Sequence, residues 1–322
     1  MKISITDTGS GIALKFAKAI GASVRGRFIY IPESKGTGYI TGFSWGKELR
    51  VLIRNYYLKE DVFIERTNEL PQGRDVVVFR LSGVFPSPIR KENPLYDERP
   101  RVLVFREAVS SVMAMFSNTI FGSIDIAVSR QYLRSCLGHI DHPIAETVLA
   151  GNEDFLYETE ISPQMVKIAS EMLDQSVPES LESYFHKLKC EELLCYTLGI
   201  LLRREAVPTR GMHIKDIKAI YATKTRLHLR LDKPPDIALQ AMEAGMSQPK
   251  MRKLFKQTFG KGVFEYYQSI RMEEAARLLK EQRLTVSEVG HRLGFTNLSH
   301  FSRVFEQHFH MKPKKYSANA VK

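Results

Sequence analysis

Five polar residues between positions 297 and 303 have the types and spacing needed to hydrogen-bond the edges of nucleic-acid bases. They fall on the side of a predicted helix that faces away from its phenylalanines, and they are Asn297, Ser299, His300, Ser302 and Arg303. Amide, hydroxyl, imidazole and guanidinium groups match the donors and acceptors that base pairs present in a major groove. The pattern therefore indicates a polar recognition surface.

Two short helices are needed to present these side chains. Thr285 and Glu288 have the spacing of a capping box, which predicts a helix start. The apolar residues that follow share one helical face, and Gly294 is placed to end that helix. Thr296 or Asn297 can cap the next helix, whose apolar side carries Phe301, Val304, Phe305 and Phe309. Two helices joined by a tight turn predict a helix-turn-helix over residues 285–309.

The same plan occurs about fifty residues earlier, over residues 236–259. Ile237, Ala241 and Gly245 match Val286, Gly290 and Gly294 at an offset of 49. Beyond the turn, an offset of 50 matches Met251, Phe255, Phe259 and Tyr266 to Phe301, Phe305, Phe309 and Tyr316. Asp236 and Ser247 can cap the two helices of this copy. Internal repetition with the core positions in phase predicts two helix-turn-helix motifs.

An amphipathic helix of about 19 residues joins the two copies. At 1.5 Å per residue it is roughly 28 Å long, which is compatible with recognition helices about one DNA turn (roughly 34 Å) apart. We expect its core side to contain Phe264, Tyr267, Ile270, Ala275, Leu278 and Leu279.

With these elements in place, residues 212–322 resemble the DNA-binding domain of the AraC/XylS family of transcription regulators. The matching positions are Ser247, Met251, Phe255, Phe259, Gly260, Arg271, Ala275, Leu278, Leu279, Gly294, Phe295, Phe301, Ser302, Arg303, Phe305, Phe309, Pro313 and Tyr316. The chain departs from the family pattern at Val263, His310 and Ser317. The resemblance implies a transcription regulator, commonly an activator, that binds double-stranded DNA and contacts RNA polymerase.

The resemblance also implies roles for individual residues. Base edges would be read by Gln248, Pro249, Arg252 and Lys253 in one groove, and by Leu298, Ser299, His300 and Arg303 in the next. Phosphates would be held by Ser247, Lys256, Lys261, Asn297, Lys312, Lys314 and Lys315.

The distribution of charge agrees with a polyanionic partner. The formal net charge of the 322-residue chain is +11. All of this excess lies after residue 212, because the first 212 residues have 26 basic and 26 acidic side chains. Segregated positive charge is the electrostatic footprint of nucleic-acid binding.

The first part of the chain predicts a β-rich region at residues 1–135. After a short helix near residues 12–20, β-branched and aromatic runs alternate with turn residues, which is typical of an antiparallel barrel or sandwich. In the resembling family a cupin-like barrel often stands here and binds a small organic effector. Our candidates for the effector pocket are Tyr30, Trp45, Arg54, Tyr56 and Phe79, with Arg54 or Arg80 as an anion anchor.

Residues 136–206 change to helical periodicity and predict a connector. Its longest apolar helix, 181–202, is broad enough to provide a dimer seam, for which Leu194, Leu198 and Leu201 are the candidates. A linker is expected at Val207–Gly211. The predicted fold class is thus multidomain α+β, with a β-rich sensory domain, a helical connector and an all-α DNA-binding domain.

An enzymatic function has less support from the sequence than DNA binding. Residues 42–46 match G-x-S-x-G, but a strand rather than a helix is expected to follow, unlike in α/β-hydrolases. The first 135 residues contain neither His nor Cys, which argues against a transition-metal site there. His139 and His142 are three residues apart but precede Pro143 in a loop. We therefore expect no enzyme, no metal and no cofactor.

Two alternatives to an effector-controlled regulator stay open. One is a DNA-binding protein with a catalytic N-terminal domain, and the other is an architectural DNA-binding protein without an effector. The three cysteines are irregularly spaced and the N-terminus has no apolar core, which predicts a cytoplasmic location. The sequence also lacks an apolar run long enough to span a membrane.

Overall fold

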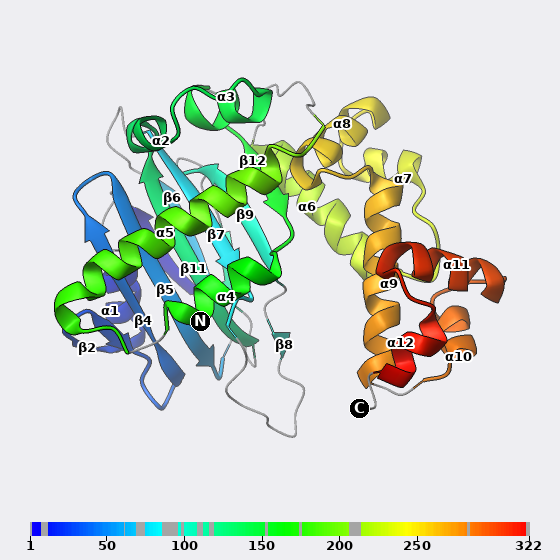
Figure 1. Cartoon of the computed structure of the whole chain (residues 1–322), viewed down its shortest axis with the longest axis horizontal. Helices are drawn as coiled ribbons and strands as arrows, with labels where there is room; N and C mark the ends of the chain where they lie inside the picture. The colour runs from blue at the N-terminus through cyan, green and yellow to red at the C-terminus, as the bar shows by residue number, and fades with distance from the viewer. Residues whose placement is uncertain are drawn as a thin grey trace. The chain divides into compact units, whose positions relative to one another are not determined.

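The computed structural model describes residues 2–7, 12–60, 62–68, 75–85, 96–97, 100–107, 112–115, 119–151, 154–173, 176–205, 214–281 and 284–319. The chain forms two compact units, Met1–Ile214 and Lys215–Lys322. A β-rich, largely antiparallel first unit precedes an all-helical second unit, as the sequence predicted (Figure 1). The linker expected at Val207–Gly211 lies outside the described residues.

The main sheet of the first unit has nine strands. Eight of them follow the order β12 (Leu156–Thr159), β9 (Arg101–Arg106), β7 (Val76–Ser82), β11 (Thr119–Ser129), β5 (Leu49–Leu58), β4 (Gly36–Trp45), β3 (Phe28–Tyr30) and β2 (Ser23–Arg25). These neighbours pair antiparallel, and β8 (Tyr96–Asp97) adds a short parallel pairing to β11. A smaller sheet contains β1 (Lys2–Asp7), β6 (Val62–Asn68) and β10 (Val112–Met115).

The predicted cupin-like barrel is not confirmed, because the main sheet is open in the described part of the chain. Its pairing path ends at β12 on one side and β2 on the other. The strands expected from β-branched runs are present. The strand β12 was not expected, because it lies inside the segment whose sequence is mainly helical.

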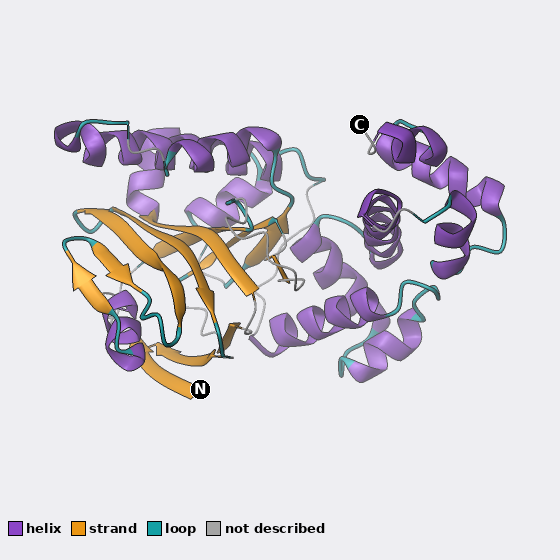
Figure 2. Ribbon diagram, turned by 90° about the horizontal axis from the view of Figure 1, so that it is seen from below, coloured by secondary structure: helices purple, strands orange, loops and turns teal. Residues whose placement is uncertain are grey.

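The two faces of the main sheet have different chemistry. Because successive strand residues point to opposite faces, Val51, Phe79 and Ile126 share one face as cross-strand partners. This apolar face is buried under α2 (Arg130–Leu137), α3 (Pro143–Leu149), α4 (Pro163–Glu171) and α5 (Glu179–Leu201). On the other face, α1 (Ile12–Ile20) packs Phe16 and Ile20 against Ile40 and Tyr56. Figure 2 shows the helices on opposite sides of the strands.

The helices of the predicted connector share one core with the sheet. Leu194, Leu198 and Leu201, our candidates for the dimer seam, are 5%, 4% and 0% exposed within that core. A partner subunit could not reach these side chains in the folded chain, so the structure corrects this assignment. The exposed apolar side chains of α5 are instead Leu181, Tyr184, Leu188 and Tyr196.

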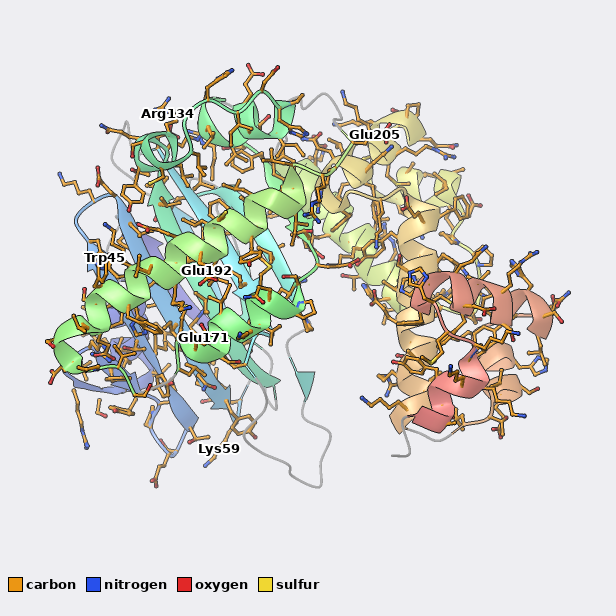
Figure 3. The ribbon with its side chains drawn as sticks, viewed as in Figure 1. Trp45, Lys59, Arg134, Glu171, Glu192 and Glu205 are labelled. Atoms are coloured by element: carbon orange, nitrogen blue, oxygen red, sulfur yellow. The ribbon has the colours of Figure 1, made fainter. Side chains whose placement is uncertain are left out.

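Polar contacts fix α4, α5 and the sheet to one another. Lys189 of α5 donates to Glu171 of α4 at 2.5 Å and to Glu192 at 3.1 Å, and both acceptors are labelled in Figure 3. At the other end of α5, the indole Nε1 of Trp45 donates to the hydroxyl of Ser183 at 3.1 Å. Trp45 is thus held by the connector helix.

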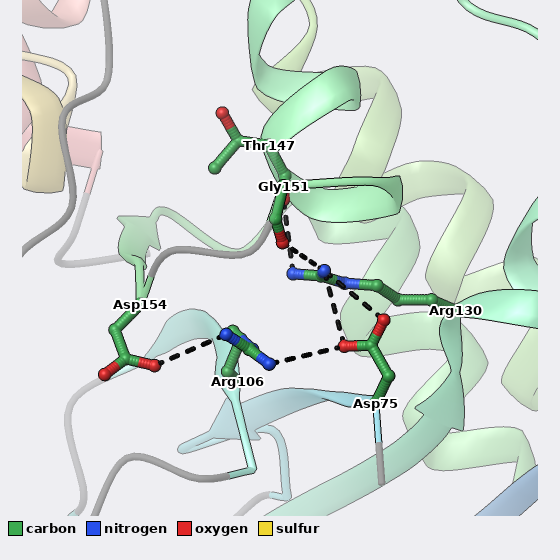
Figure 4. A network of polar contacts seen from close by, with 6 residues as sticks. All are labelled: Asp75, Arg106, Arg130, Thr147, Gly151 and Asp154. Carbon is green, nitrogen blue, oxygen red and sulfur yellow. Dashed lines mark hydrogen bonds and ion pairs between the residues drawn. The ribbon is translucent and has the colours of Figure 1, made fainter. Parts of the chain in front are cut away.

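Buried Arg130 joins the end of β11 to the helices that follow it. Its guanidinium donates to the carbonyl oxygens of Thr147 and Gly151 and pairs with Asp75 (Figure 4). Arg106 pairs with the same Asp75 at 3.6 Å and with Asp154 at 3.8 Å. A guanidinium that is 1% exposed can be tolerated here because carbonyl and carboxylate oxygens surround it. The network belongs to the framework of the unit.

The described residues of the second unit form helices joined by short turns, without a strand. Its helices are α6 (Ile214–Leu229), α7 (Ile237–Glu243), α8 (Gln248–Phe259), α9 (Val263–Glu281), α10 (Val286–Arg292), α11 (Leu298–Phe309) and α12 (Pro313–Asn319). None of the described helices of either unit has the length and apolar character needed to cross a membrane.

Candidate nucleic-acid interface

Local capping fixes the first helix-turn-helix, α7–α8. The carboxylate of Asp236 accepts from the backbone N–H groups of Ala238 and Leu239, and Ser247 caps α8 by accepting from Lys250. Pro249 lies in the first turn of α8, where a missing N–H has no consequence. Gly260 ends α8 in the left-handed region at φ 73°.

The second helix-turn-helix, α10–α11, is built in the same way. The predicted capping box is present, because Thr285 and Glu288 exchange hydrogen bonds at 3.2 and 2.7 Å. Asn297, rather than Thr296, caps α11 by accepting from the N–H of His300 at 3.0 Å. Gly294 lies in the turn at φ 78°. In this copy His310 takes the place of Gly260 and adopts φ 53°.

The aromatic residues that ended each sequence repeat form two matching clusters. Phe255, Phe259 and Tyr266 have ring-centroid distances of 4.5, 5.4 and 5.2 Å. The corresponding distances among Phe305, Phe309 and Tyr316 are 4.7, 5.4 and 5.2 Å. The internal repeat is therefore a repeat of packing as well as of sequence.

Arg271 of α9 ties the joining helix to the segment before α7 and to the turn of the second copy. Its guanidinium is buried and donates to the carbonyl oxygens of Leu231 at 2.9 Å and Leu293 at 3.0 and 2.5 Å. It also lies 3.9 Å from the ring centroid of Phe295. Burial lowers the pKa of Arg271 below its ordinary value, an effect that neighbouring Tyr267 and Asp232 oppose. From its sequence Arg271 was assigned only as a match to the family pattern, and this role was not predicted.

The base-reading candidates lie at the starts of the two recognition helices. Gln248, Pro249 and Arg252 of α8 are exposed, and so are Ser299, His300 and Arg303 of α11. Lys253 and Leu298 are half-buried. The arrangement brings a short polar surface with one arginine to the outer side of each recognition helix.

The phosphate candidates differ in their exposure. Ser247, Asn297, Lys312, Lys314 and Lys315 are exposed, whereas Lys256 and Lys261 are half-buried. The Nζ of Lys261 donates to the hydroxyl of Ser269 at 3.2 Å. Sequence reasoning did not consider Lys250, an exposed residue of α8 whose Nζ lies 2.8 Å from Asp216 of α6. Its place near Arg252 and Lys253 in the sequence could have identified Lys250 as a further phosphate candidate.

The charge is uneven between the two copies. Helix α8 has four basic and no acidic side chains, whereas α11 has Arg303 and Glu306. Because phosphate neutralisation supplies sequence-independent affinity, the first copy is better suited to general attraction.

The effector-pocket candidates do not converge on one place. Trp45 and Phe79 belong to the apolar face of the main sheet, and Tyr30 is 39% exposed near its edge. Arg54 and Tyr56 lie together on the opposite face, since they are two residues apart on β5. No single pocket can contain all five side chains. Of the five candidates, only Arg54 and Tyr56 lie on the same face as neighbours.

The motifs set aside in the sequence have ordinary structural roles. Residues 42–46 cross from β4 into a turn, where the hydroxyl of Ser44 donates to the carbonyl of Gly46. His142 caps α3 by accepting from the N–H of Ile144. Among the residues that the structure describes, no cluster of His, Cys, Asp and Glu has the makings of a metal site.

Comparisons with known proteins agree with the helix-turn-helix structure of the second unit. A family described as "Helix-turn-helix domain" matches residues 240–319. The transcriptional regulator GlxA of Rhizobium meliloti (strain 1021) is 30% identical over 112 residues, which cover 34% of this chain and 35% of GlxA. The transcriptional activator RhaR of Yersinia pseudotuberculosis serotype O:3 (strain YPIII) is 21% identical over 277 residues, which cover 86% of this chain and 91% of RhaR.

A solved structure of a transcriptional regulator with an AraC-type DNA-binding domain from Chromobacterium violaceum is 23% identical to this chain. The match covers 34% of this chain and 98% of that one, with a TM-score of 0.32.

Two helix-turn-helix motifs on one connecting helix, with exposed polar starts to both recognition helices, define a DNA-binding protein of the tandem helix-turn-helix class. Residues 240–319 match the helix-turn-helix domain family, and the relatives GlxA and RhaR are a transcriptional regulator and a transcriptional activator. The relatives are regulators and not enzymes, in agreement with the expectation from the sequence.

Proposed function

We propose that this chain binds specific double-stranded DNA sites through α8 and α11 and regulates transcription in the cytoplasm in response to a small organic effector. The observation that carries the proposal is the repeated recognition surface in a unit that holds all the excess positive charge. Arg252 and Arg303 would read guanine edges, because the guanidinium fork matches O6 and N7. Lysines and capped helix starts would hold the phosphates and set the register.

Salt titration of DNA binding by the purified full chain tests this function. With about 6–10 phosphate contacts, the association constant should fall by a factor of roughly 10³–10⁵ between 50 and 200 mM salt. Binding sites selected from a random DNA pool should contain two separate blocks. A flat salt response together with no selected sequence would contradict the proposal.

Single amino-acid substitutions distinguish residues that read bases from residues that bind phosphates. Arg252→Ala should relax preference at one block and Arg303→Ala at the other, each by about 1–3 kcal/mol at its own base pairs. Lys314→Ala is the control, because a phosphate contact should weaken all sequences alike. Binding-site selection on each variant is the measurement. Loss of preference at the same base pairs in both arginine variants would exclude the two-groove arrangement.

The first unit is proposed to be the sensory domain, cupin-like in form. The support is a large sheet with a polar buried face, together with a second, three-stranded sheet in the same unit. Ligand binding to the folded state raises the melting temperature, so thermal-shift screening of the full chain detects an effector. The absence of a shift across broad chemical classes would favour an architectural DNA-binding protein.

Dimerisation through the outer side of α5 is proposed in place of the buried leucines. Leu181, Tyr184 and Leu188 are 55%, 62% and 45% exposed and follow helical spacing. Tyr184→Glu should convert dimers to folded monomers in sedimentation velocity. Leu198→Asp is the contrasting variant and should unfold the first unit, since it places a charge in the core. A Tyr184→Glu variant that stays dimeric would place the interface elsewhere.

The remaining part of the proposal is that the chain contacts RNA polymerase and thereby activates transcription. The second unit exposes Leu229, Met242 and Phe264 at 77%, 71% and 50%, so the sequence-based assignment of Phe264 to the core was wrong. Exposed apolar side chains of this kind suit a protein partner. Transcription in vitro from a selected site is the measurement, and unchanged transcription on a bound site would contradict activation.

A further inference from the structure

A row of polar side chains crosses the face of the main sheet that lies opposite the connector helices. Arg101, Ser82, Ser123 and Arg54 are successive cross-strand partners on β9, β7, β11 and β5. Both serines are 1% exposed and Arg54 is 8% exposed. Neighbouring strands lie about 4.8 Å apart, so the two arginines flank two hydroxyl groups across roughly 14 Å of the sheet.

The next row on the same face is also charged. Arg80 and Asp125 are cross-strand partners there. One oxygen of the Asp125 carboxylate accepts from Arg54 at 2.7 Å and from Arg80 at 2.9 Å, and the other accepts from Arg80 at 2.9 Å. Burial raises the pKa of Asp125, but Arg54 and Arg80 outweigh it and hold the pKa below its ordinary value. This acceptor is therefore ionised and already shared between two guanidinium groups.

Within the described part of the chain, the buried hydroxyl oxygen of Ser82 and the buried Nε of Arg101 in this first row have no hydrogen-bond partner. Buried polar groups in folded proteins are nearly always paired, so each exception calls for an explanation. Both groups can donate a hydrogen bond, and a bound ligand with acceptor atoms would satisfy both.

Apolar side chains lie beside this row on the same face. Tyr56 pairs across strands with Phe121, next to Ser123, and both rings pack at a centroid distance of 5.3 Å. Leu52 and Ile40 extend the same cluster towards α1. The face thus combines hydrogen-bond donors with an adjoining apolar surface.

We propose that the row formed by Arg101, Ser82, Ser123 and Arg54 binds the carboxylate of a small organic acid, whose apolar body lies against Tyr56, Phe121 and Leu52. This inference rests on the proposed sensory function and names its ligand class. A carboxylate accepts only, which matches the unpaired donors, and guanidinium groups bind it through paired hydrogen bonds. A sugar also needs acceptors for its hydroxyl protons, whereas Asp125 is occupied by two arginines.

Thermal shift of the purified full chain with matched probes tests the ligand class. The probes are sodium benzoate and sodium hexanoate, with benzyl alcohol, hexan-1-ol and sodium chloride at equal concentration as neutral and ionic controls. A probe at ten times its Kd multiplies the folded-to-unfolded ratio roughly elevenfold. We expect at least one carboxylate, and none of the controls, to raise the Tm. No shift with either carboxylate, or an equal shift with its alcohol, would overturn the proposal.

Three variants locate the binding. Ser82→Ala and Arg101→Gln should abolish the shift, because each removes one of the unpaired donors. Thr41→Val is the matched control, since Thr41 also has a buried, unpaired hydroxyl but points to the opposite face of the sheet through its pairing with Ile53. It should respond like the unsubstituted chain. If Ser82→Ala does not fold, Arg101→Gln decides, and an unchanged shift in Arg101→Gln would refute the site.

DNA binding by the same preparations separates this inference from the function on which it rests. An unresponsive chain that still binds selected DNA would overturn the carboxylate site alone. A chain that responds to carboxylates but binds no DNA would support the site and contradict the proposed regulatory function.

Discussion

Replacing Gly294 with alanine is expected to destabilise the second helix-turn-helix by about 2–5 kcal/mol and to abolish specific DNA binding. Gly294 adopts φ 78°, where an L-residue with a Cβ costs roughly 1–2 kcal/mol. An added Cβ would also lie 1.8 Å from the carbonyl oxygen of Asp232. That oxygen belongs to the backbone and cannot rotate away, so overpacking adds about 1–3 kcal/mol. Urea unfolding and binding to a selected site are the measurements.

Gly245 supplies the matched control in the first copy. It has nearly the same backbone conformation, φ 63°, but a Cβ there would meet nothing within 4 Å. Gly245→Ala should therefore cost only the conformational part, about 1–2 kcal/mol. The difference between the two variants measures the contact with Asp232. Equal losses in the two variants would show that this contact has no energetic consequence.

Replacing Asp125 with asparagine is expected to destabilise the first unit by about 3–5 kcal/mol at neutral pH. Removing one partner of a buried ion pair leaves uncompensated charge, and here Arg54 and Arg80 would lose the same carboxylate. Asp154→Asn is the control, because that carboxylate is 36% exposed and lies 3.8 Å from Arg106. It should cost less than about 1 kcal/mol. Similar losses for both variants would contradict the importance of the buried network.

The pH dependence of the same variant follows from the direction of the pKa shift. Arg54 and Arg80 hold the pKa of Asp125 below its ordinary value of 3.8 in the folded state. Its contribution to stability is therefore complete above about pH 3.8 and disappears as the pH falls through the folded pKa. The difference in free energy of unfolding between the unsubstituted chain and Asp125→Asn should be constant from pH 7 to 5 and shrink below pH 3.8.

Much of the second unit was predictable from sequence because its signals are local. The capping residues Asp236, Ser247 and Thr285 act on backbone groups two or three positions away. Gly294 was recognised from the conformation that a turn requires, and the two aromatic clusters were visible as an offset of 50. Repetition doubled each of these signals, so the two motifs could be assigned from the residues.

The roles of buried charged side chains required the tertiary structure. Arg54 and Arg80 meet Asp125 across 71 and 45 residues of sequence. Arg271 donates to the carbonyl oxygens of Leu231, 40 residues before it, and Leu293, 22 residues after it in the sequence. Such partners depend on strand register and helix packing, which no local pattern encodes. A polar residue in a strand therefore predicts a face but not its partner.

The tandem helix-turn-helix domain and the β-rich region before it were both predicted from the residues alone. The side of α5 that lies in the core was not predictable in this way and became clear from the packing. Leu194 and Leu188 are equally apolar, yet one is 5% and the other 45% exposed. The physical reason is that α5 is apolar on more than one side, so its own periodicity cannot orient it, and the sheet beneath it selects the buried face.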